Sequence, residues 1–405
     1  MGMLKLAFRN IRRQRGRTLL TLGVIVLGVS GLILADGFVA DVFVQLREAT
    51  IHSRLGHLQL YRAGYYSYGR RAPFDYLIES PDLLLDSLQG IAQVRQVSKR
   101  IEFAGLATVG GADLPVIGEG IEPDKEKRLG TALQIAAGRH LTAQDHYGVL
   151  IGLGVAETMH LAPGDTLTLL VNTPHGGVNT LDLEVVGIFR SFSKDYDDRA
   201  VRIPLETAQE LLVTDGVHSL VFLLEETEAT ERVAASLRER LDGDDFEVRT
   251  WEELAAFYRK TVDLYDRQFG VLQFITLVMV VLSVANSINM AVFERRGEFG
   301  TLMALGFRRN SIQRLILLES MLLGGMGALA GVVVGTTLAG GISLVGIPMP
   351  PPPNANSGYT AFIRIVPSVV AAAALVGWLS TVLAALLPAR RVSRLPVVEA
   401  LRHNI

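Results

Sequence analysis

The sequence contains no cysteine, and of its 405 residues only 2 are Trp and 10 are Tyr. Without cysteine the chain forms no disulfide, no thiolate nucleophile and no cysteine-based zinc site. Charged residues make up 20% of the sequence, whereas hydrophobic residues make up 49%, and the mean hydropathy is +0.32. This excess of apolar surface excludes a disordered or fibrous chain and argues against a single compact soluble domain.

The sequence also lacks the short motifs of many enzymes. It has no G-x-x-x-x-G-K-[ST] phosphate-binding loop and no G-x-S-x-G nucleophile motif. His140 and His146 lie close together but have no acidic or histidine partner at helical spacing. The acidic stretch with Asp195, Asp197 and Asp198 lacks the ligand spacing of an EF-hand calcium loop. We therefore expect no catalytic constellation, no metal site and no cofactor in this chain.

The hydrophobic residues are concentrated in four runs. They are Thr18 to Phe38, Gln268 to Phe293, Leu315 to Ile347 and Pro367 to Leu387. Each run reaches the roughly 20 residues that a helix needs to cross a bilayer. The first run follows a basic segment, as a signal peptide does, but it is longer than a signal-peptide core and no cleavage site follows it. We interpret it as an uncleaved membrane anchor.

Charge is distributed asymmetrically around these runs. Segments 1–17, 294–314 and 388–405 together carry 15 basic residues against 3 acidic ones, whereas residues 39–267 carry 23 basic and 36 acidic ones. Because positively charged loops stay on the cytoplasmic side, both termini and the 294–314 loop are expected in the cytoplasm. Residues 39–267 and the loop 348–366 are then expected on the outer side.

The segment 39–267 has the composition of a soluble domain. Apolar alternation predicts strands at 56–61, 103–109, 114–121, 165–171, 181–189 and 218–224. Amphipathic patterns predict helices at 81–88, 205–213, 230–241 and 251–266. Thr250 with Glu253 three residues later is a capping box for the last helix, which we expect to continue into the second run. The predicted fold class is a membrane α-helical protein of four transmembrane helices, with a large α+β domain inserted between the first and second.

The segment 294–314, ERRGEFGTLMALGFRRNSIQR, lies between the second and third runs. Phe299, Leu302, Met303 and Leu305 fall on one face of a short helix that Gly306 would end. Such a helix at the inner membrane surface has an apolar face for docking on a partner. A solvated connecting loop flanked by arginines is the alternative, and the pattern alone does not separate the two.

Small residues recur at four-residue spacing in the third run, at Gly324, Ala328, Gly331 and Gly335. Such spacing lets helix backbones approach closely, within one chain or between two copies. We favour this interpretation over the general enrichment of glycine in membrane helices.

Two acidic residues, Asp36 and Glu319, fall at or near membrane depth, where ionisable groups are costly and often functional. Both lie near a predicted helix end, so we expect them at the membrane interface. The proline-rich loop at 349–367 is expected to be stiff and extended. It is either a structural lid over the third and fourth spans or a surface that touches substrate.

Several stretches resemble a known family of membrane proteins. LAFRNIRRQRGRTLLTLGVIVLG, ERRGEFGTLMALGFRRNSI and LPARRVSRLPVVEALR are similar to three parts of the permease subunits of the MacB/FtsX/LolC–LolE (mechanotransmission) group of ABC transporters. GHLQLYRAGY, AGRHLTAQDHYGVLIG and LAPGDTLTLL resemble the periplasmic core of that group. The resemblance spans nearly the whole chain, and it is closest to lipoprotein-releasing subunits.

The resemblance implies a multi-pass protein of the bacterial inner membrane with its large domain in the periplasm. It implies a second permease copy or a paralogue as one partner. The other partner would be a separate ABC ATPase, present in two copies, which binds ATP and Mg²⁺. This chain is therefore not expected to be an enzyme. The outer domain would divide into a porter-like part, residues 39–105 and 201–267, and a β-rich sabre-like part, residues 106–200.

The resemblance also implies that the segment 294–314 forms the coupling helix, which binds to the ATPase. Its residues would be Glu294, Arg295, Arg296, Glu298, Phe299, Leu302, Leu305 and Gly306. ATP-driven motion would pass to the periplasmic domain and move lipoprotein or lipid-like cargo from the outer leaflet. Further partners would be membrane lipid and a periplasmic carrier, adaptor or lipoprotein. No nucleic acid is expected as a partner. Alternatives are efflux or antimicrobial-peptide export, regulation of cell-wall hydrolases, and a membrane-anchored sensor or scaffold.

Overall fold

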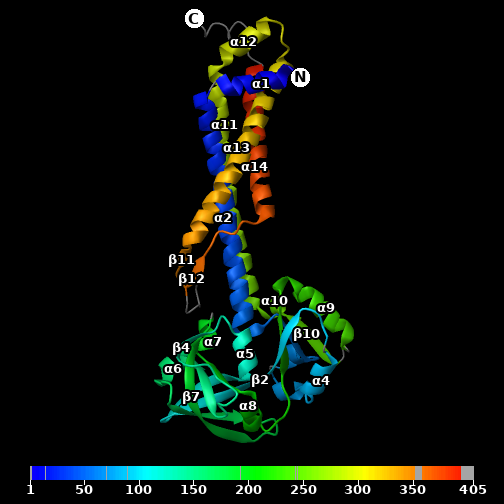
Figure 1. The fold of residues 1–405 in the computed structure, drawn as a ribbon, viewed down its shortest axis with the longest axis vertical. Coiled ribbons are helices and arrows are strands. Elements are labelled where there is room, and N and C mark those ends of the chain that lie inside the picture. The colour runs from blue at the N-terminus through cyan, green and yellow to red at the C-terminus, as the bar shows by residue number, and fades with distance from the viewer. Residues whose placement is uncertain are drawn as a thin grey trace. The chain divides into compact units, whose positions relative to one another are not determined.

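The computed structural model describes residues 2–13, 15–69, 71–88, 90–191, 193–241, 243, 245–351 and 358–393. The chain divides into two compact units (Figure 1). The helical unit comprises Met1–Val44, Val262–Pro348 and Thr360–Ile405. The outer unit comprises Gln45–Thr261 and Met349–Tyr359.

Four long helices carry the apolar runs of the sequence. They are α2 (Arg15–Thr50), α11 (Ala256–Glu294), α13 (Arg309–Val345) and α14 (Pro367–Ser393). Each contains a stretch that is long and apolar enough to cross a membrane, which confirms the four predicted helices. Two shorter helices, α1 (Gly2–Arg13) and α12 (Arg296–Ala304), belong to the same unit.

The long helices pack around a core of branched aliphatic side chains. Ile25, Val29 and Ile33 of α2 meet Val284 and Ile288 of α11 there, together with side chains of α13 and α14. The carboxyl-terminal half of the loop between α13 and α14 is fixed to α2. There the Phe362 backbone N–H and the Arg364 side chain both donate to the buried carboxylate of Asp41, at 2.8 and 3.0 Å.

Small residues of α13 lie where neighbouring helices come closest. A Cβ added at Gly331 would lie 2.7 Å from Val29 Cβ, and one added at Gly335 would lie 3.1 Å from Ser30 Cα, both on α2. A Cβ added at Gly324 would lie 3.0 Å from Thr381 Cβ on α14. Ala328 is buried in the same core. Within this chain, then, these positions lie at contacts between α13 and its neighbours.

Some helix ends differ from the sequence-based expectation. The helix of the first run continues beyond Phe38 to Thr50, and the helix of the third run ends at Val345 because Gly346 takes φ +73°. Ile347 therefore belongs to a strand, β11 (Ile347–Met349), which pairs with β12 (Tyr359–Ala361). The expectations for 352–357 in the proline-rich loop and for 394–405 in the carboxyl-terminal tail lie outside the described residues.

The predicted single helix over 251–266 is wrong at one point. Thr250 does form the capping box with Glu253, but α10 (Trp251–Leu254) ends after one turn. The chain leaves helical geometry at Ala255, with φ −85° and ψ 62°, and α11 then begins at Ala256.

The first half of the outer unit's architecture is an antiparallel sheet of four strands. Its order is β10-β1-β9-β2, formed by β1 (Leu58–Arg62), β2 (Val94–Val109), β9 (Ser219–Leu224) and β10 (Phe246–Thr250). Helix α4 (Pro81–Ser87) lies between β1 and β2 in the chain, and α9 (Thr230–Arg240) lies between β9 and β10. Each strand–helix–strand unit thus leaves a gap that a strand of the other unit fills, which is the double split β-α-β pattern.

The second half is a closed ring of six strands, which consists of β2 and of five strands that lie between β2 and β9 in the chain. Around the ring the order is β2, β3 (Ala112–Ile121), β8 (Ala200–Pro204), β5 (Gly148–Gly152), β7 (Val178–Arg190), β6 (Thr166–Asn172) and β2 again. β2 belongs to both halves because its residues 94–100 pair with β9 and its residues 105–108 pair with β6. Closure leaves the ring without free strand edges between its members.

Shorter elements complete the outer unit. They are the turn η1 (Ile51–Leu55), α3 (Tyr65–Tyr68), η2 (Pro73–Tyr76), α5 (Pro123–Leu129), β4 (Gln134–Gly138), α6 (Leu153–Met159), α7 (Lys194–Asp197), α8 (Leu205–Leu212) and η3 (Thr227–Ala229). Five of the six predicted strands are confirmed within three residues at their ends, and the strand predicted at 103–109 is β2, which begins nine residues earlier, at Val94. β5 and β8 were missed because all five residues of each are buried, so neither shows the alternation of a half-exposed strand.

Candidate functional site

Helix α12 begins where the chain turns between α11 and α13. Phe299 is fully buried in the core of the helical unit, and Leu302 and Met303 pack against the same core. At the other end Gly306 takes φ +90°, the Gly306 N–H donates to the Met303 carbonyl at 3.0 Å, and the Phe307 N–H donates to the Leu302 carbonyl at 3.1 Å. This pair of bonds is a Schellman motif, so Gly306 ends the helix as the sequence predicts.

The apolar side chains of this segment do not all share one face. Leu305 follows the last turn of α12 and its exposed fraction is 74%, and that of Phe307 is 43%. The prediction that Leu305 lies on the same face as Phe299 is therefore wrong, because the Leu305 N–H still donates to the Thr301 carbonyl, and residues six apart on such a helix point about 120° away from each other. The segment has a buried base around Phe299 and an exposed apolar tip, which we define as Leu305 and Phe307.

The amino-terminal end of α12 is fixed by a buried ion pair. Arg295 Nη1 lies 2.5 Å from Glu319 Oε2 of α13, and both residues are only 8% exposed. Arg295 Nε also donates to Glu298 Oε2 at 3.1 Å, and Asn10 of α1 donates to Glu319 Oε1 at 2.7 Å. We call Asn10, Arg295, Glu298 and Glu319 the Glu319 cluster. Glu319 stands out in the sequence as a costly acid, but its partners are distant in the sequence and leave no local pattern.

The remaining residues predicted for the coupling helix lie beside this cluster. Glu294 is the last residue of α11. The Arg296 guanidinium lies 3.7 Å from the centre of the Phe293 ring, a cation–π contact. The other acid flagged from the sequence, Asp36, accepts a hydrogen bond from Gln273 of α11. Asp36 and Gln273 line a pocket of about 170 Å³ between α2 and α11.

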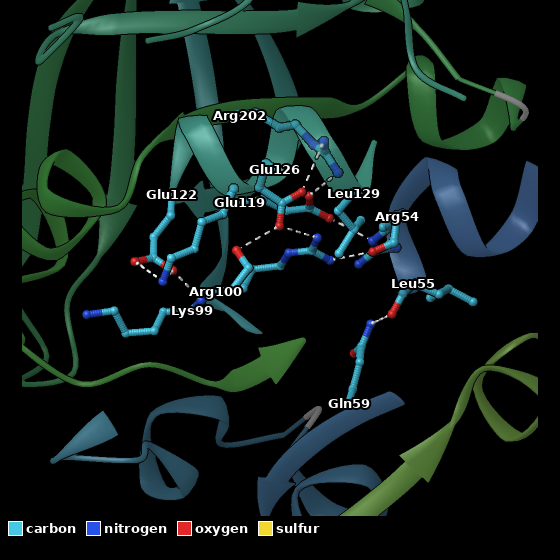
Figure 2. Close-up of polar contacts among 12 residues, drawn as sticks. Arg54, Leu55, Gln59, Lys99, Arg100, Glu119, Glu122, Glu126, Leu129 and Arg202 are labelled. Atoms are coloured by element: carbon cyan, nitrogen blue, oxygen red, sulfur yellow. Dashed lines mark hydrogen bonds and ion pairs between the residues drawn. The ribbon is translucent and has the colours of Figure 1, made fainter. Parts of the chain in front are cut away.

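A second group of buried ions lies in the outer unit (Figure 2). Glu119 of β3 is fully buried and lies 2.6 Å from Arg54 Nε and 2.9 Å from Arg202 Nη2. Burial alone would raise the pKa of Glu119, but Arg202 and Arg54 outweigh it and hold this pKa well below its ordinary value. Arg54 also reaches Glu102 of β2 at 3.0 Å.

The group continues through a second buried carboxylate. Glu126 of α5 lies 2.7 Å from Arg100 of β2 and 3.7 Å from Arg202 of β8. Arg100 Nη1 in turn donates to the backbone carbonyl of Arg54 in η1 at 2.8 Å. We call Arg54, Arg100, Glu102, Glu119, Glu126 and Arg202 the Glu119 cluster. It joins β2, β3, β8, α5 and η1, and none of its members was singled out from the sequence.

The acidic stretch near 195 has structural partners. Both carboxylate oxygens of buried Asp197 accept the Ser191 N–H, and Asp198 pairs with Lys194 at 2.9 Å. His146 has a mostly exposed side chain. Across the described part of the chain, no three His, Asp or Glu side chains gather closely enough to hold a metal ion.

Four long apolar helices with an α+β domain inserted after the first define a multi-pass membrane protein with an extracytoplasmic domain. The family model for the MacB-like periplasmic core domain matches residues 18–240, and the model for the FtsX-like permease C-terminal domain matches residues 270–397. The chain belongs to the MacB/FtsX/LolC family of ABC transporter permeases.

Several curated relatives are similar over much of the chain. An uncharacterized ABC transporter permease of Methanocaldococcus jannaschii is 24% identical over 82% of this chain and 82% of its own. The lipoprotein-releasing system transmembrane protein LolC of Neisseria meningitidis is 23% identical over 96% of this chain and 94% of its own. The macrolide export ATP-binding/permease protein MacB of Hyphomonas neptunium is 28% identical over 98% of this chain, which spans 60% of that relative's length.

A solved structure is also similar to part of the chain. The periplasmic region of MacB from Actinobacillus actinomycetemcomitans matches 51% of this chain and 93% of its own, with 15% identity and a TM-score of 0.37.

Proposed function

We propose that this permease transmits the motion of a separate ATPase subunit to its outer unit. Family membership implies a partner ATPase. The observation that carries the proposal is the geometry of α12, which has a buried base at Phe299 and Arg295 and an exposed apolar tip at Leu305 and Phe307. The tip is the docking surface, since exposed apolar side chains at the end of a fixed helix are typical of an interface.

The proposed orientation places α12 and both termini in the cytoplasm. The charge asymmetry of the sequence supports it, because the segments around α1, α12 and the end of α14 are rich in arginine. The outer unit then lies in the periplasm of a bacterial inner membrane.

ATP and Mg²⁺ bind to the partner subunit in this proposal. The sequence has no G-x-x-x-x-G-K-[ST] motif, and both matched models are permease domains. The functional assembly holds two permease chains, identical or paralogous, and two ATPases. Motion passes along α2 and α11, the two helices whose residues belong to both units.

The proposed cargo is a lipoprotein or a lipid-like molecule of the outer leaflet. The LolC relative supports this, because the match covers nearly the whole of both chains. A second candidate is export of a smaller molecule, since relatives named for macrolide and pyoverdine export are 28% identical to this chain over their matched regions.

Affinity purification of the tagged full-length chain in nanodiscs, with mass spectrometry of the retained proteins, tests the proposal. We expect an ATPase to co-purify, together with a lipoprotein if the first cargo is right. Leu305→Glu should lose the ATPase, because it places a charge in the docking surface. Leu83→Glu is the matched control, since Leu83 of α4 is 73% exposed but belongs to the outer unit. Retention of the ATPase by Leu305→Glu at the parent level would contradict the docking assignment.

A further inference from the structure

We propose that Glu319 is a positioning residue that fixes both α12 and α1 against α13, so that docking of the ATPase moves the membrane helices rather than α12 alone. The proposal rests on the function proposed above. It assigns a role to a side chain on the third long helix that does not itself touch the ATPase.

The Glu319 carboxylate is shared between two elements that are far apart in the sequence. Oε2 accepts from Arg295 Nη1 at 2.5 Å, and Oε1 accepts from Arg295 Nη2 at 3.3 Å and from Asn10 Nδ2 at 2.7 Å. Arg295 is the N-cap residue of α12, and Asn10 belongs to α1. One carboxylate therefore holds the start of α12 and the end of α1 on the same turn of α13.

The arginine of this cluster is held on both of its edges. While its two Nη atoms face Glu319, its Nε donates to Glu298 in the first turn of α12 at 3.1 Å. The Arg295 Cζ atom also lies 5.0 Å from the centre of the Phe299 ring. A guanidinium is a rigid planar fork, so rotating α12 against α13 would break at least one of these bonds.

Burial makes it costly to break the Arg295–Glu319 pair. Arg295 and Glu319 are each 8% exposed, and removing one member of a buried ion pair leaves the other charge uncompensated. Partial separation of Arg295 from Glu319 is therefore disfavoured, and α12 is expected to move together with α13.

Helix α1 is attached to the same carboxylate by a weaker link. Ala7 and Ile11 of α1 are buried, while Leu6 and Phe8 are 43% and 56% exposed. Asn10 adds one hydrogen bond, from its neutral side-chain amide to the Glu319 carboxylate. Asn10→Ala therefore separates the two attachments, because it removes the α1 bond and leaves the Arg295–Glu319 pair in place.

Spin-label distances in the permease alone test the positioning role without any ATPase. The natural chain has no cysteine, so Phe8→Cys and Ala304→Cys carry labels on α1 and α12 with no background. We expect a narrow distance distribution in the parent and a broad one in Glu319→Gln and Arg295→Gln. Asp263→Asn is the control, because it removes an exposed pair with Arg267, 2.9 Å apart, from α11. Narrow, unshifted distributions in both cluster variants would overturn the proposal.

Two further variants separate positioning from a general folding defect. The exchange Arg295→Glu/Glu319→Arg should narrow the distribution part of the way back to the parent, because the pair is restored with its charges reversed while the bonds to Glu298 and from Asn10 are lost. Asn10→Ala should broaden the distribution less than Glu319→Gln, and this variant keeps the buried ions paired. If the exchange stays as broad as the single variants while Asn10→Ala matches the parent, Glu319 does not position these helices through the pair.

The complex with the co-purifying ATPase gives the functional readout. We expect Glu319→Gln to retain the ATPase while the permease-dependent part of ATP hydrolysis falls roughly tenfold, the size of a typical coupling between sites. Absence of an ATPase from the parent preparation would contradict the proposed function, and the label distances would still test Glu319. Unchanged labels and unchanged hydrolysis in a parent-like complex would overturn the Glu319 proposal alone.

Discussion

The Glu119 cluster of the outer unit and the Glu319 cluster of the helical unit both contain buried arginine–glutamate ion pairs, but the two clusters have different roles. In the first, Glu119, Glu126, Arg100 and Arg202 are all buried, and Glu119, Glu126 and Arg202 each have two partners of opposite charge. Such a network crosses three strands and leaves no member free to move alone. It therefore stabilises one arrangement of the outer unit.

The Glu319 cluster has fewer charges, and it joins three helical segments, at α1, α12 and α13. One carboxylate serves Arg295 and Asn10, which belong to segments that are far apart in the sequence. Loss of Glu319 should therefore release two short helices while the long helices keep their packing. Burial alone therefore does not separate the two roles, because the Glu119 cluster crosses strands of one sheet, whereas the Glu319 cluster joins two short helices to a long one.

The two tryptophans allow each unit to be followed separately. Trp251 is buried in the outer unit, and Trp378 packs against the core of the helical unit. Trp378→Phe leaves fluorescence from the outer unit, and Trp251→Phe leaves fluorescence from the helical unit. The predictions below use these two backgrounds, with urea for the outer unit and SDS in bicelles for the helical unit.

The largest effect is expected for Glu119→Gln. It leaves Arg54 and Arg202 without their shared carboxylate in a fully buried position, which should lower the free energy of unfolding of the outer unit by about 3–5 kcal/mol. The Trp251 transition should shift to lower urea, and the Trp378 transition should stay in place. A loss below about 1 kcal/mol would show that the Glu119 cluster does not stabilise this unit.

Acid should weaken the outer unit through two buried histidines. His57 Nδ1 accepts the Leu224 N–H at 3.2 Å and His218 Nδ1 accepts the Glu102 N–H at 3.0 Å, so both rings are neutral with the proton on Nε2. Burial lowers the pKa of each to about 4, against 6.5 for an unperturbed histidine. The unfolded state binds more protons between these values, so stability falls as pH drops from 6.5 to 4, by roughly 3 kcal/mol per histidine.

Urea titrations of the Trp251 signal at several pH values measure this loss. His57→Gln and His218→Gln should each reduce the change in the free energy of unfolding between pH 6.5 and 4. The Glu319 cluster contains no histidine, so the Trp378 transition should change little over the same window. A flat pH profile for the outer unit would contradict the neutral-histidine assignment.

A smaller effect is expected where α13 meets α2. Gly331→Ala places a Cβ 2.7 Å from Val29 Cβ, so one helix must shift, at a cost of about 1–3 kcal/mol to the helical unit. Gly340→Ala is the matched control on the same helix, because nothing lies within 4 Å of the added atom. SDS titrations of the Trp378 signal compare the two, and equal transitions would argue against close packing at Gly331.

The smallest effect is expected for Asp263→Asn. Asp263 and Arg267 form an exposed pair on α11, with side chains 63% and 77% exposed, so the loss should stay below about 1 kcal/mol. SDS titrations of the Trp378 signal measure this loss, because Asp263 belongs to the helical unit. A loss as large as that for Glu119→Gln would remove the basis of the comparison.

Sequence patterns found the elements that carry periodic or long apolar signals. The four membrane helices followed from run length, and Gly306 and the Thr250–Glu253 box gave two helix ends. The same patterns missed the break at Ala255, because a single non-helical residue between two helical stretches leaves no periodic trace. They also placed Leu305 with Phe299, although residues six apart on a helix point about 120° away from each other, and Leu305 is exposed while Phe299 is buried.

The sequence by itself determined that this chain spans a membrane four times, carries a soluble domain after the first span and has a short helix between the second and third. Those features depend on local composition, because the length and hydrophobicity of a segment decide whether it crosses a bilayer or packs in a soluble core. Only the tertiary structure decided which charges meet. Arg54 and Glu119, or Asn10 and Glu319, are distant in sequence, and strand order and helix packing alone bring them within hydrogen-bonding distance.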